Sequence, residues 1–208
     1  MNIISIDECG RGSGYGPISI GMLPITYNQS IDKHLDNKEL EILNWANSVI
    51  GKPLKSLDSK TITPKRRELL FDAYKEPFIV LFEDCSDITY KGLLDIKINL
   101  MITRGLQLLE DKGFIPDLLL CDGSIYPLCS YQSITITKGD YKYPSIGLSS
   151  ILCKVLRDTY INSLSTLENP MYDLVNNKGY LTAKHIEAIG KLGMTSTHRP
   201  LFCNKFIR

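Results

Sequence analysis

Four acidic residues end or follow short apolar segments whose residue types are typical of β-strands. They are Asp7, Glu8, Asp122 and Asp140. In an open α/β sheet, ligands bind beyond the carboxyl ends of the strands, so carboxylates from distant parts of the chain can converge at that edge. Successive strand residues point to opposite faces, so Asp7 and Glu8 share a site only if the strand bends or ends there.

Carboxylates held close together repel and raise one another's pKa, and a hard cation removes that conflict. Mg²⁺ and Mn²⁺ favour oxygen ligands, and Mg²⁺ is commonly held by one or two carboxylates together with substrate phosphate and water. Two such ions can activate a water molecule and stabilise the leaving oxygen of a phosphodiester. Taken singly, each acid is better explained as a helix or turn cap, and Asp122-Gly123 is a turn signal. The shared position at strand ends favours a metal site.

A glycine-rich segment follows the first two acids and runs Gly10-Arg11-Gly12-Ser13-Gly14-Tyr15-Gly16-Pro17. It lacks the pattern of a nucleoside-triphosphate phosphate loop, and no helix pattern follows it as a dinucleotide fingerprint requires. Glycine lets the chain bend after Glu8 and lets the backbone approach a ligand closely. A backbone able to grip a sugar hydroxyl could sense the 2′-hydroxyl that distinguishes RNA from DNA. A plain tight turn between two strands is the alternative.

Several basic and aromatic residues could contact a nucleic acid. Lys60 lies in a predicted loop and could contact phosphate. Lys154 and Arg157 lie on a predicted helix, where Lys154 and Asp158 share one face and can form an ion pair instead. Tyr180 precedes a predicted helix and could stack on a sugar or base, or could belong to the core.

The periodicity predicts an α/β protein with a mixed sheet. Apolar segments predict strands at residues 2–7, 17–24, 77–83, 118–121 and 131–137. Helical spacing, with Pro and Gly as start and stop signals, predicts helices at residues 39–50, from 64 onward, about 94–108, 144–167 and 182–192. We expect a main domain at residues 1–168 and a helical and loop appendage at residues 169–208 packed on it.

Composition limits the class of protein. The chain has 208 residues, 43% of them hydrophobic, enough for one folded domain with a sizeable core. The net charge is +1, but residues 138–208 carry 10 basic and 5 acidic side chains, which indicates a polyanion-binding face or ordinary surface variation. No apolar run could span a membrane and no signal peptide is evident, so we expect a cytoplasmic protein. Six scattered cysteines and three histidines indicate reduced thiols rather than disulfides or a transition-metal site.

Short, distinct motifs lie along almost the whole chain in a specific order. They are Ile6-Asp7-Glu8-Cys9-Gly10-Arg11-Gly12, Asp58-Ser59-Lys60, Asp122-Gly123, Lys138-Gly139-Asp140, Cys153-Lys154-Val155-Leu156-Arg157-Asp158, Lys178-Gly179-Tyr180-Leu181-Thr182 and His198-Arg199. In these motifs the chain resembles ribonuclease HII, a type 2 ribonuclease H, over about residues 3–202. The resemblance implies a ribonuclease H-like fold: a five-stranded mixed sheet flanked by helices, with a C-terminal helical appendage.

The resemblance also implies an activity. It implies an endonuclease with a two-metal site for Mg²⁺ or Mn²⁺ that cuts RNA in RNA–DNA hybrids. Such enzymes also cut 5′ of ribonucleotides embedded in DNA, leaving 3′-hydroxyl and 5′-phosphate ends, in primer removal and ribonucleotide excision repair. The metal-binding and catalytic residues would be Asp7, Glu8, Asp122 and Asp140. The substrate-binding residues would be Gly10, Arg11, Gly12, Lys60, Ser150, Lys154, Arg157 and Tyr180, with Tyr180 stacking at the ribonucleotide–deoxyribonucleotide junction. We expect a monomer.

The sequence departs from the family pattern close to the predicted site. Cys9 and Cys153 stand where relatives usually carry alanine, Leu148 lies in a stretch that is usually alanine-rich, and Asn177 replaces a common histidine. These departures motivate a second hypothesis, a non-catalytic protein that binds hybrids, although clustered acids facing phosphates oppose it. A third hypothesis is a nuclease of the same fold that acts on other DNA structures. It would cut an all-DNA duplex equally well.

Overall fold

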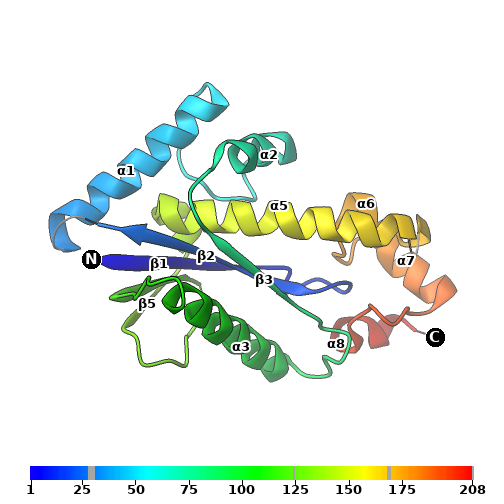
Figure 1. Cartoon of the computed structure of the whole chain (residues 1–208). Coiled ribbons are helices and arrows are strands. Elements are labelled where there is room, and N and C mark those ends of the chain that lie inside the picture. The colour runs from blue at the N-terminus through cyan, green and yellow to red at the C-terminus, as the bar shows by residue number, and fades with distance from the viewer. Residues whose placement is uncertain (28–30, 124, 168–169, 208) are drawn as a thin grey trace.

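The computed structural model describes residues 1–27, 31–123, 125–167 and 170–207. A five-stranded sheet in the order β3-β2-β1-β4-β5 lies at its centre (Figure 1). The strands are β1 (Asn2–Cys9), β2 (Ile18–Thr26), β3 (Ile79–Glu83), β4 (Leu118–Asp122) and β5 (Ser133–Ile136). The β2 strand runs antiparallel to β1 and β3, whereas β1, β4 and β5 run parallel, so the sheet is mixed as the sequence predicted.

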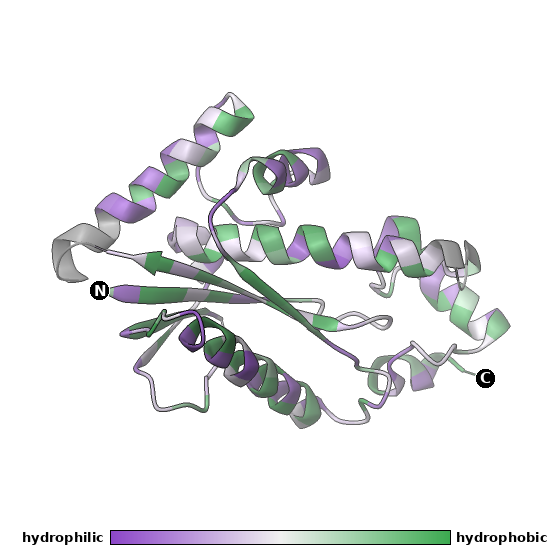
Figure 2. Cartoon of the chain, in the orientation of Figure 1, coloured by the Kyte–Doolittle hydropathy of each residue, from purple (hydrophilic) through white to green (hydrophobic). Residues whose placement is uncertain are grey.

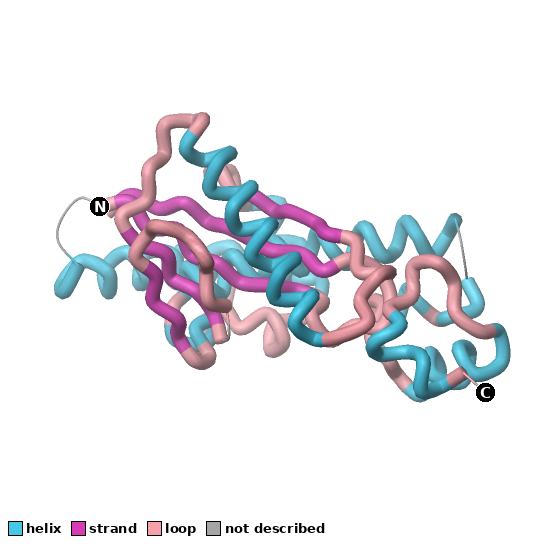
Figure 3. The backbone as a smooth tube through the Cα atoms, turned by 90° about the horizontal axis from the view of Figure 1, so that it is seen from below, coloured by secondary structure: helices cyan, strands magenta, loops and turns pink. Residues whose placement is uncertain are grey.

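Helices cover both faces of the sheet. The α-helices of the described residues are α1 (Ile31–Ile50), α2 (Pro64–Ala73), α3 (Lys91–Glu110), α4 (Gly139–Lys142), α5 (Pro144–Leu167), α6 (Leu174–Asn177), α7 (Ala183–Leu192) and α8 (Pro200–Cys203). Figures 1 and 3 show α3 crossing one face and α5 running along the other. The bounds of α5 are those predicted, whereas α1 begins before residue 39. The β1 strand continues past Asp7 because Cys9 still pairs with Ser19 of β2.

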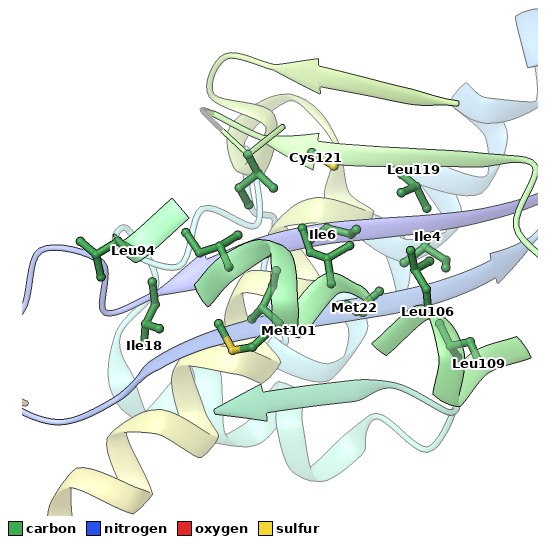
Figure 4. Packing of buried hydrophobic residues seen from close by; sticks show 14 of the residues in the cluster. Ile4, Ile6, Ile18, Met22, Leu94, Met101, Leu106, Leu109, Leu119 and Cys121 are labelled. Atoms are coloured by element: carbon green, nitrogen blue, oxygen red, sulfur yellow. The ribbon is translucent and has the colours of Figure 1, made fainter. Parts of the chain in front are cut away.

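Side chains of β1 alternate between two hydrophobic clusters. Ile4 and Ile6 share a cluster with Met101 of α3 (Figure 4). Ile3 belongs instead to a cluster with Ile151 of α5. Because both faces of the strand are covered, its first half, Ile3-Ile4-Ser5-Ile6, is mostly apolar. Figure 2 shows hydrophobic colouring in this part of β1. Each such isoleucine contributes about 1.5–3 kcal/mol by leaving water.

The α5 helix approaches the sheet closely at Gly21. This glycine lies opposite Asp7 in the pairing of β1 with β2. A Cβ atom on Gly21 would lie 2.6 Å from the backbone oxygen of Ser149, which is too close for any side chain. The bare backbone therefore lets α5 lie directly against the strands, where its Ser150 hydrogen-bonds with the Asp7 carboxylate.

The C-terminal segment packs onto the end of α5 and the loop between β1 and β2. A third hydrophobic cluster there contains Tyr15 from the loop, Ile161 from α5, and Tyr172, Leu174 and Ile189 from the C-terminal segment. Figure 1 shows α6, α7 and α8 gathered at this end of the molecule. The division into two domains stays a prediction, and its boundary at residues 168 and 169 lies outside the described residues.

Two sequence-based exclusions can be compared with the structure. Across the described ranges, no helix is long and apolar enough to cross a membrane. All six cysteines are free, and all but Cys129 are buried. The cysteines are therefore reduced thiols, as their scattered spacing predicted.

Candidate active site

Asp7 and Asp122 lie side by side at the carboxyl ends of neighbouring parallel strands. Ile6 of β1 is in register with Cys121 of β4, so the next residue on each strand is an aspartate. Neighbouring strands are about 4.8 Å apart, so the two backbones approach within one strand spacing. By the alternation along each strand, both carboxylates project toward the face that α5 covers.

Asp7 is buried among like charges. Its side chain is only 5% exposed. It accepts a hydrogen bond from the backbone N–H of Glu8 at 2.8 Å and another from Ser150. Burial raises the pKa of Asp7 well above its usual value, and the charges of Glu8 and Asp122 raise it further, against the smaller lowering effect of these hydrogen bonds. The folded protein therefore holds this carboxylate at a cost that a bound cation would offset.

Asp122 connects β4 to the short helix α4. Its Oδ1 atom accepts hydrogen bonds from the backbone N–H of Gly139 at 2.5 Å and of Asp140 at 3.2 Å. This contact brings Asp140, which is 8% exposed, to the same edge of the sheet. The pKa of Asp140 is raised, first by burial and then by the charge of Asp122. The sequence predicted Asp140 beyond the last strand, and it lies in the first turn of α4.

Glu8 lies on the opposite side of β1 from Asp7 but remains part of the same electrostatic group. Burial and the charge of Asp122 raise the pKa of Glu8, while Arg11 and Lys60 lower it. The Arg11 guanidinium lies 3.9 Å from the Glu8 carboxylate and also hydrogen-bonds with Asp95 of α3. The strand does not bend to bring both acids to one face, so Glu8 approaches the shared edge from the α3 side.

The arrangement of donors bears on whether this site fits a metal ion. Within the described ranges, no group of three or more His, Cys, Asp or Glu side chains is close enough to hold one as it stands. Mg²⁺ needs only one or two carboxylates when phosphate and water complete its shell, and Asp7 with Asp122 is such a pair. Their oxygen donors fit a hard divalent cation, which would also relieve the repulsion that raises the pKa of Asp7.

Two buried arginines, Arg157 and Arg199, hold the glycine loop by hydrogen bonds. Gly10 has φ +84°, and the site of a Cβ there is occupied by Arg157. Arg157 is 0% exposed and donates to the carbonyls of Pro17 at 3.0 Å and Lys178 at 3.0 Å. Arg157 is therefore placed as a support of the loop, out of reach of a phosphate. Gly12 is exposed, and its missing Cβ faces open space where a ligand could approach.

The other predicted substrate-binding side chains surround the acids. Lys60 is exposed and lowers the pKa of both Glu8 and Asp140, so it lies near the acidic edge. Ser150 is buried and also hydrogen-bonds with Ser59 at 3.0 Å. Lys154 forms the ion pair that its spacing from Asp158 suggested, at 2.6 Å. Its ammonium group is thereby held close to the site.

Tyr180 is 36% exposed and lies beside the basic residues of α5. The Lys154 ammonium is 5.3 Å and the Arg157 guanidinium 5.6 Å from the ring centre. The hydroxyl hydrogen-bonds with the thiol of Cys9, and burial of the hydroxyl raises the pKa of Tyr180. The contact of the hydroxyl with Cys9 and the two cations beside the ring thus hold the side chain in place. Part of the ring stays accessible, as a stacking platform requires.

Sequence reasoning did not assign a role to Arg199, to Asp95 or to the contact of Cys9 with Tyr180. Arg199 is 0% exposed and donates to the Gly10 carbonyl at 2.7 Å. The only sequence signal for it was the position of His198-Arg199 within the family pattern. A cavity of about 760 Å³ between α1, α2 and the ends of β2 and α3 includes none of the predicted site residues in its lining.

Comparison with known proteins identifies the family of the chain. A family model described as Ribonuclease HII matches residues 52–205. Proteins named Ribonuclease HII from Synechocystis sp. and Pelagibacter ubique are 32% and 35% identical to the chain, over 97% of the chain and 96% of each relative. The chain belongs to the ribonuclease HII family. Like other members, it is a metal-dependent endonuclease of the ribonuclease H class that acts on RNA–DNA hybrids.

Solved structures share the fold. The ribonuclease H2 of Pyrococcus horikoshii is 21% identical, with a TM-score of 0.65 over 99% of this chain and 97% of its own. A Bst-RNase HIII structure in complex with Mn²⁺ is 16% identical, with a TM-score of 0.68 over 97% of this chain and 66% of its own. At these identities the likeness shows the ribonuclease H-like fold, which the ribonuclease HII resemblance had predicted.

Proposed function

We propose that this ribonuclease HII cuts on the 5′ side of ribonucleotides embedded in duplex DNA as well as within RNA–DNA hybrids. It leaves 3′-hydroxyl and 5′-phosphate ends. The observation that carries the proposal is the register of β1 with β4, which puts Asp7 and Asp122 next to each other at the edge where Glu8 and Asp140 also lie. The divalent ions that assist hydrolysis of a phosphodiester need negative oxygen donors of this kind to hold them.

In this proposal Asp7 and Asp122 bind the divalent ions most directly, and Glu8 and Asp140 assist. When held there, Mg²⁺ or Mn²⁺ would activate a water molecule and stabilise the leaving oxygen. Ser150 orients the Asp7 carboxylate through its hydrogen bond. The amides of Gly139 and Asp140 orient Asp122 in the same way. These contacts hold the carboxylates in place before substrate arrives, which reduces the reorganisation needed for reaction.

Selection of ribose over deoxyribose is assigned to the loop of Gly10, Arg11 and Gly12. This assignment is supported by the exposed Gly12 backbone and by the buried arginines that hold the loop from behind. Tyr180 stacks on the nucleotide at the junction, and Lys60 and Lys154 contact phosphate. Arg157 acts as their support, because it is fully buried.

The activity suits two roles, primer removal during replication and excision repair of misincorporated ribonucleotides. That the chain works as a monomer in the cytoplasm stays a prediction. Size-exclusion chromatography with light scattering and cell fractionation test those two points.

The deciding experiment digests three duplexes side by side in Mg²⁺ and in Mn²⁺: all-DNA, DNA with one ribonucleotide, and a long RNA–DNA hybrid. We expect cleavage of the second and third only, with one cut 5′ of the single ribonucleotide. An Asp7→Asn, Asp122→Asn double variant should be inactive, and retained activity would contradict the site. Equal cleavage of the all-DNA duplex would favour a structure-specific DNA nuclease. Salt-sensitive binding without cleavage would favour a non-catalytic hybrid-binding protein.

A further inference from the structure

Two neighbouring residues near the C-terminus, His198 and Arg199, contact the two elements that the proposed function assigns to substrate recognition. Arg199 reaches the glycine loop, and His198 reaches the segment of Tyr180 through His185. Both side chains are buried. Neither can touch a nucleic acid directly, so any role in recognition is one of positioning.

Arg199 grips the glycine loop by its carbonyl groups. Its Nε–H donates to the Gly16 carbonyl at 2.8 Å, and its Nη1 donates to the carbonyls of Gly10 at 2.7 Å and Arg11 at 3.2 Å. Among the described residues no ion pair neutralises this guanidinium, and its Nη2 has no hydrogen-bond partner. A buried cation costs free energy unless hydrogen-bond acceptors surround it, and here the acceptors are backbone carbonyls of the loop. The loop must keep these carbonyls in place, so Arg199 favours a single loop conformation.

The His198 side chain is one link of an ordered hydrogen-bond chain. The backbone N–H of Thr195 donates to His198 Nδ1 at 3.0 Å, which leaves the proton on Nε2. His198 Nε2 then donates to His185 Nε2 at 3.1 Å. His185 must therefore carry its own proton on Nδ1, which donates to the Tyr180 carbonyl at 2.9 Å. One arrangement of neutral tautomers satisfies every link.

Main-chain bonds already join the two elements at one point. The Gly179 carbonyl accepts from the N–H groups of Gly14 and Tyr15, at 2.9 and 3.1 Å. The Arg199 N–H donates to the Gly14 carbonyl at 2.8 Å. These contacts lie in the middle of the loop, at Gly14 and Tyr15. The side chains of Arg199 and His198 extend the connection to Gly10 and Arg11, where the loop leaves β1, and to the Tyr180 backbone.

We propose that His198 and Arg199 form a clamp that sets the spacing between the ribose-sensing backbone of Gly10 to Gly12 and the ring of Tyr180. The inference rests on the proposed function, because it concerns the discrimination of a ribonucleotide–deoxyribonucleotide junction. Such a junction must meet both elements at once. A misplacement of about 1 Å in a recognition site can cost ~10²-fold in rate.

The test compares kcat/KM on a duplex with one ribonucleotide against kcat/KM on a long hybrid. We expect Arg199→Met to lower the ratio of the two values by about 10-fold or more, because only the first substrate depends on one fixed junction. Arg199→Lys, which keeps a charge but offers a single donor point, should restore part of the ratio. His198→Asn keeps an acceptor for Thr195 but cannot reach His185, and it should also lower the ratio.

Matched controls separate positioning from loss of stability. Tyr172→Phe removes the hydrogen bond from the Tyr172 hydroxyl to the Gly193 carbonyl in the same cluster, and Leu109→Ala makes a cavity in the distant core. Both should leave the ratio within about 2-fold of wild type, because a smaller folded fraction lowers both kcat/KM values equally. A ratio unchanged in all three clamp variants, or lowered equally by the controls, would overturn the clamp.

Binding without divalent ions gives a readout that needs no cleavage. Fluorescence anisotropy should show the preference for a single-ribonucleotide duplex over the all-DNA duplex reduced in Arg199→Met and His198→Asn. If Arg199→Met does not fold, His198→Asn and Arg199→Lys decide the question. A wild-type protein without that preference, and without cleavage at the ribonucleotide, counts against the proposed function. An intact wild type with unaffected variants counts against the clamp alone.

Discussion

The thiol of Cys9 hydrogen-bonds with the hydroxyl of Tyr180. The two residues lie on β1 and just before α7, far apart in sequence. Cys9 directly follows the acidic pair of Asp7 and Glu8. This contact therefore ties the proposed stacking ring to the strand that carries the metal-binding carboxylates.

Replacing Cys9 by alanine should weaken recognition without unfolding the protein. The lost hydrogen bond has a value of about 0.5–1.5 kcal/mol, which corresponds to roughly 2- to 12-fold in affinity for a single-ribonucleotide duplex. Equilibrium binding of that duplex measures the effect. Cys153→Ala removes a buried thiol that bonds with Ser19 and not with Tyr180, and it should leave the affinity unchanged. Equal losses in both variants would contradict the role of this contact.

Removing the buried charge at Asp7 should stabilise the metal-free protein while abolishing cleavage. The pKa of Asp7 is raised in the folded state, so at neutral pH its ionised form opposes folding, and this opposition fades as pH falls through the raised value. Asp7→Asn should raise the free energy of unfolding at pH 7 by about 1 kcal/mol. Urea unfolding in EDTA measures it. A destabilised variant would show that the carboxylate is held favourably.

Binding of divalent ions should stabilise the folded protein, because it offsets the repulsion between the clustered carboxylates. A ligand at 100 times its Kd stabilises the folded state by about 2.7 kcal/mol. The wild-type Tm should therefore rise on addition of MgCl₂ or MnCl₂, and differential scanning calorimetry can follow it. The Asp7→Asn, Asp122→Asn variant should show little rise. The same rise in both proteins would place the ions elsewhere.

The paired histidines should make the protein acid-sensitive. Burial, and then the neighbouring His185, lower the pKa of His198 to about 4. Between that value and the ordinary 6.5, the unfolded chain binds more protons than the folded protein does. The contribution of neutral His198 to the free energy of unfolding is therefore fully present above this window and is lost as pH drops through it. The groups around the pair are the rings of Tyr15 and Tyr172, and Asp173, whose charge raises the pKa of His185.

Urea unfolding between pH 7 and 4 measures this contribution. The wild type should lose about 2 kcal/mol from it, whereas His198→Asn should lose less over the same range. The comparison of slopes removes the opposite contribution of the acids with raised pKa values. Identical slopes would show that the histidines do not titrate in this way.

Glu39 of α1 should be important for stability and not for activity. Its buried carboxylate accepts from the Ser145 backbone N–H at 2.6 Å and from the Ser145 hydroxyl at 2.5 Å, at the start of α5. Glu39→Gln removes the charge that favours a helix N-terminus, and it should cost about 1–2 kcal/mol with kcat unchanged. Glu41→Gln, on the exposed side of the same helix, should cost no more than about 0.5 kcal/mol. Equal costs would contradict the capping role.

Local signals made much of the site predictable. The apolar run before Asp122 indicated a buried strand, and the acids at two strand ends predicted a meeting that the register of β1 with β4 produces. Sequence periodicity gave less information about hydrogen bonds whose partners lie far apart in the sequence. Arg199 bonds to carbonyls 183 and 189 residues earlier in the chain, and backbone acceptors leave no mark in the sequence. The same reason hid the burial of Arg157, whose residue type suggested a phosphate contact.

The third hydrophobic cluster, which contains Tyr15, is separate from the two clusters that build the sheet. Such peripheral units can open while the rest of a protein stays folded. The carboxylates sit on the central strands, whereas the loop and Tyr180 depend on the peripheral unit. On warming, this nuclease should therefore lose its preference for ribonucleotides at a lower temperature than it loses its cleavage activity.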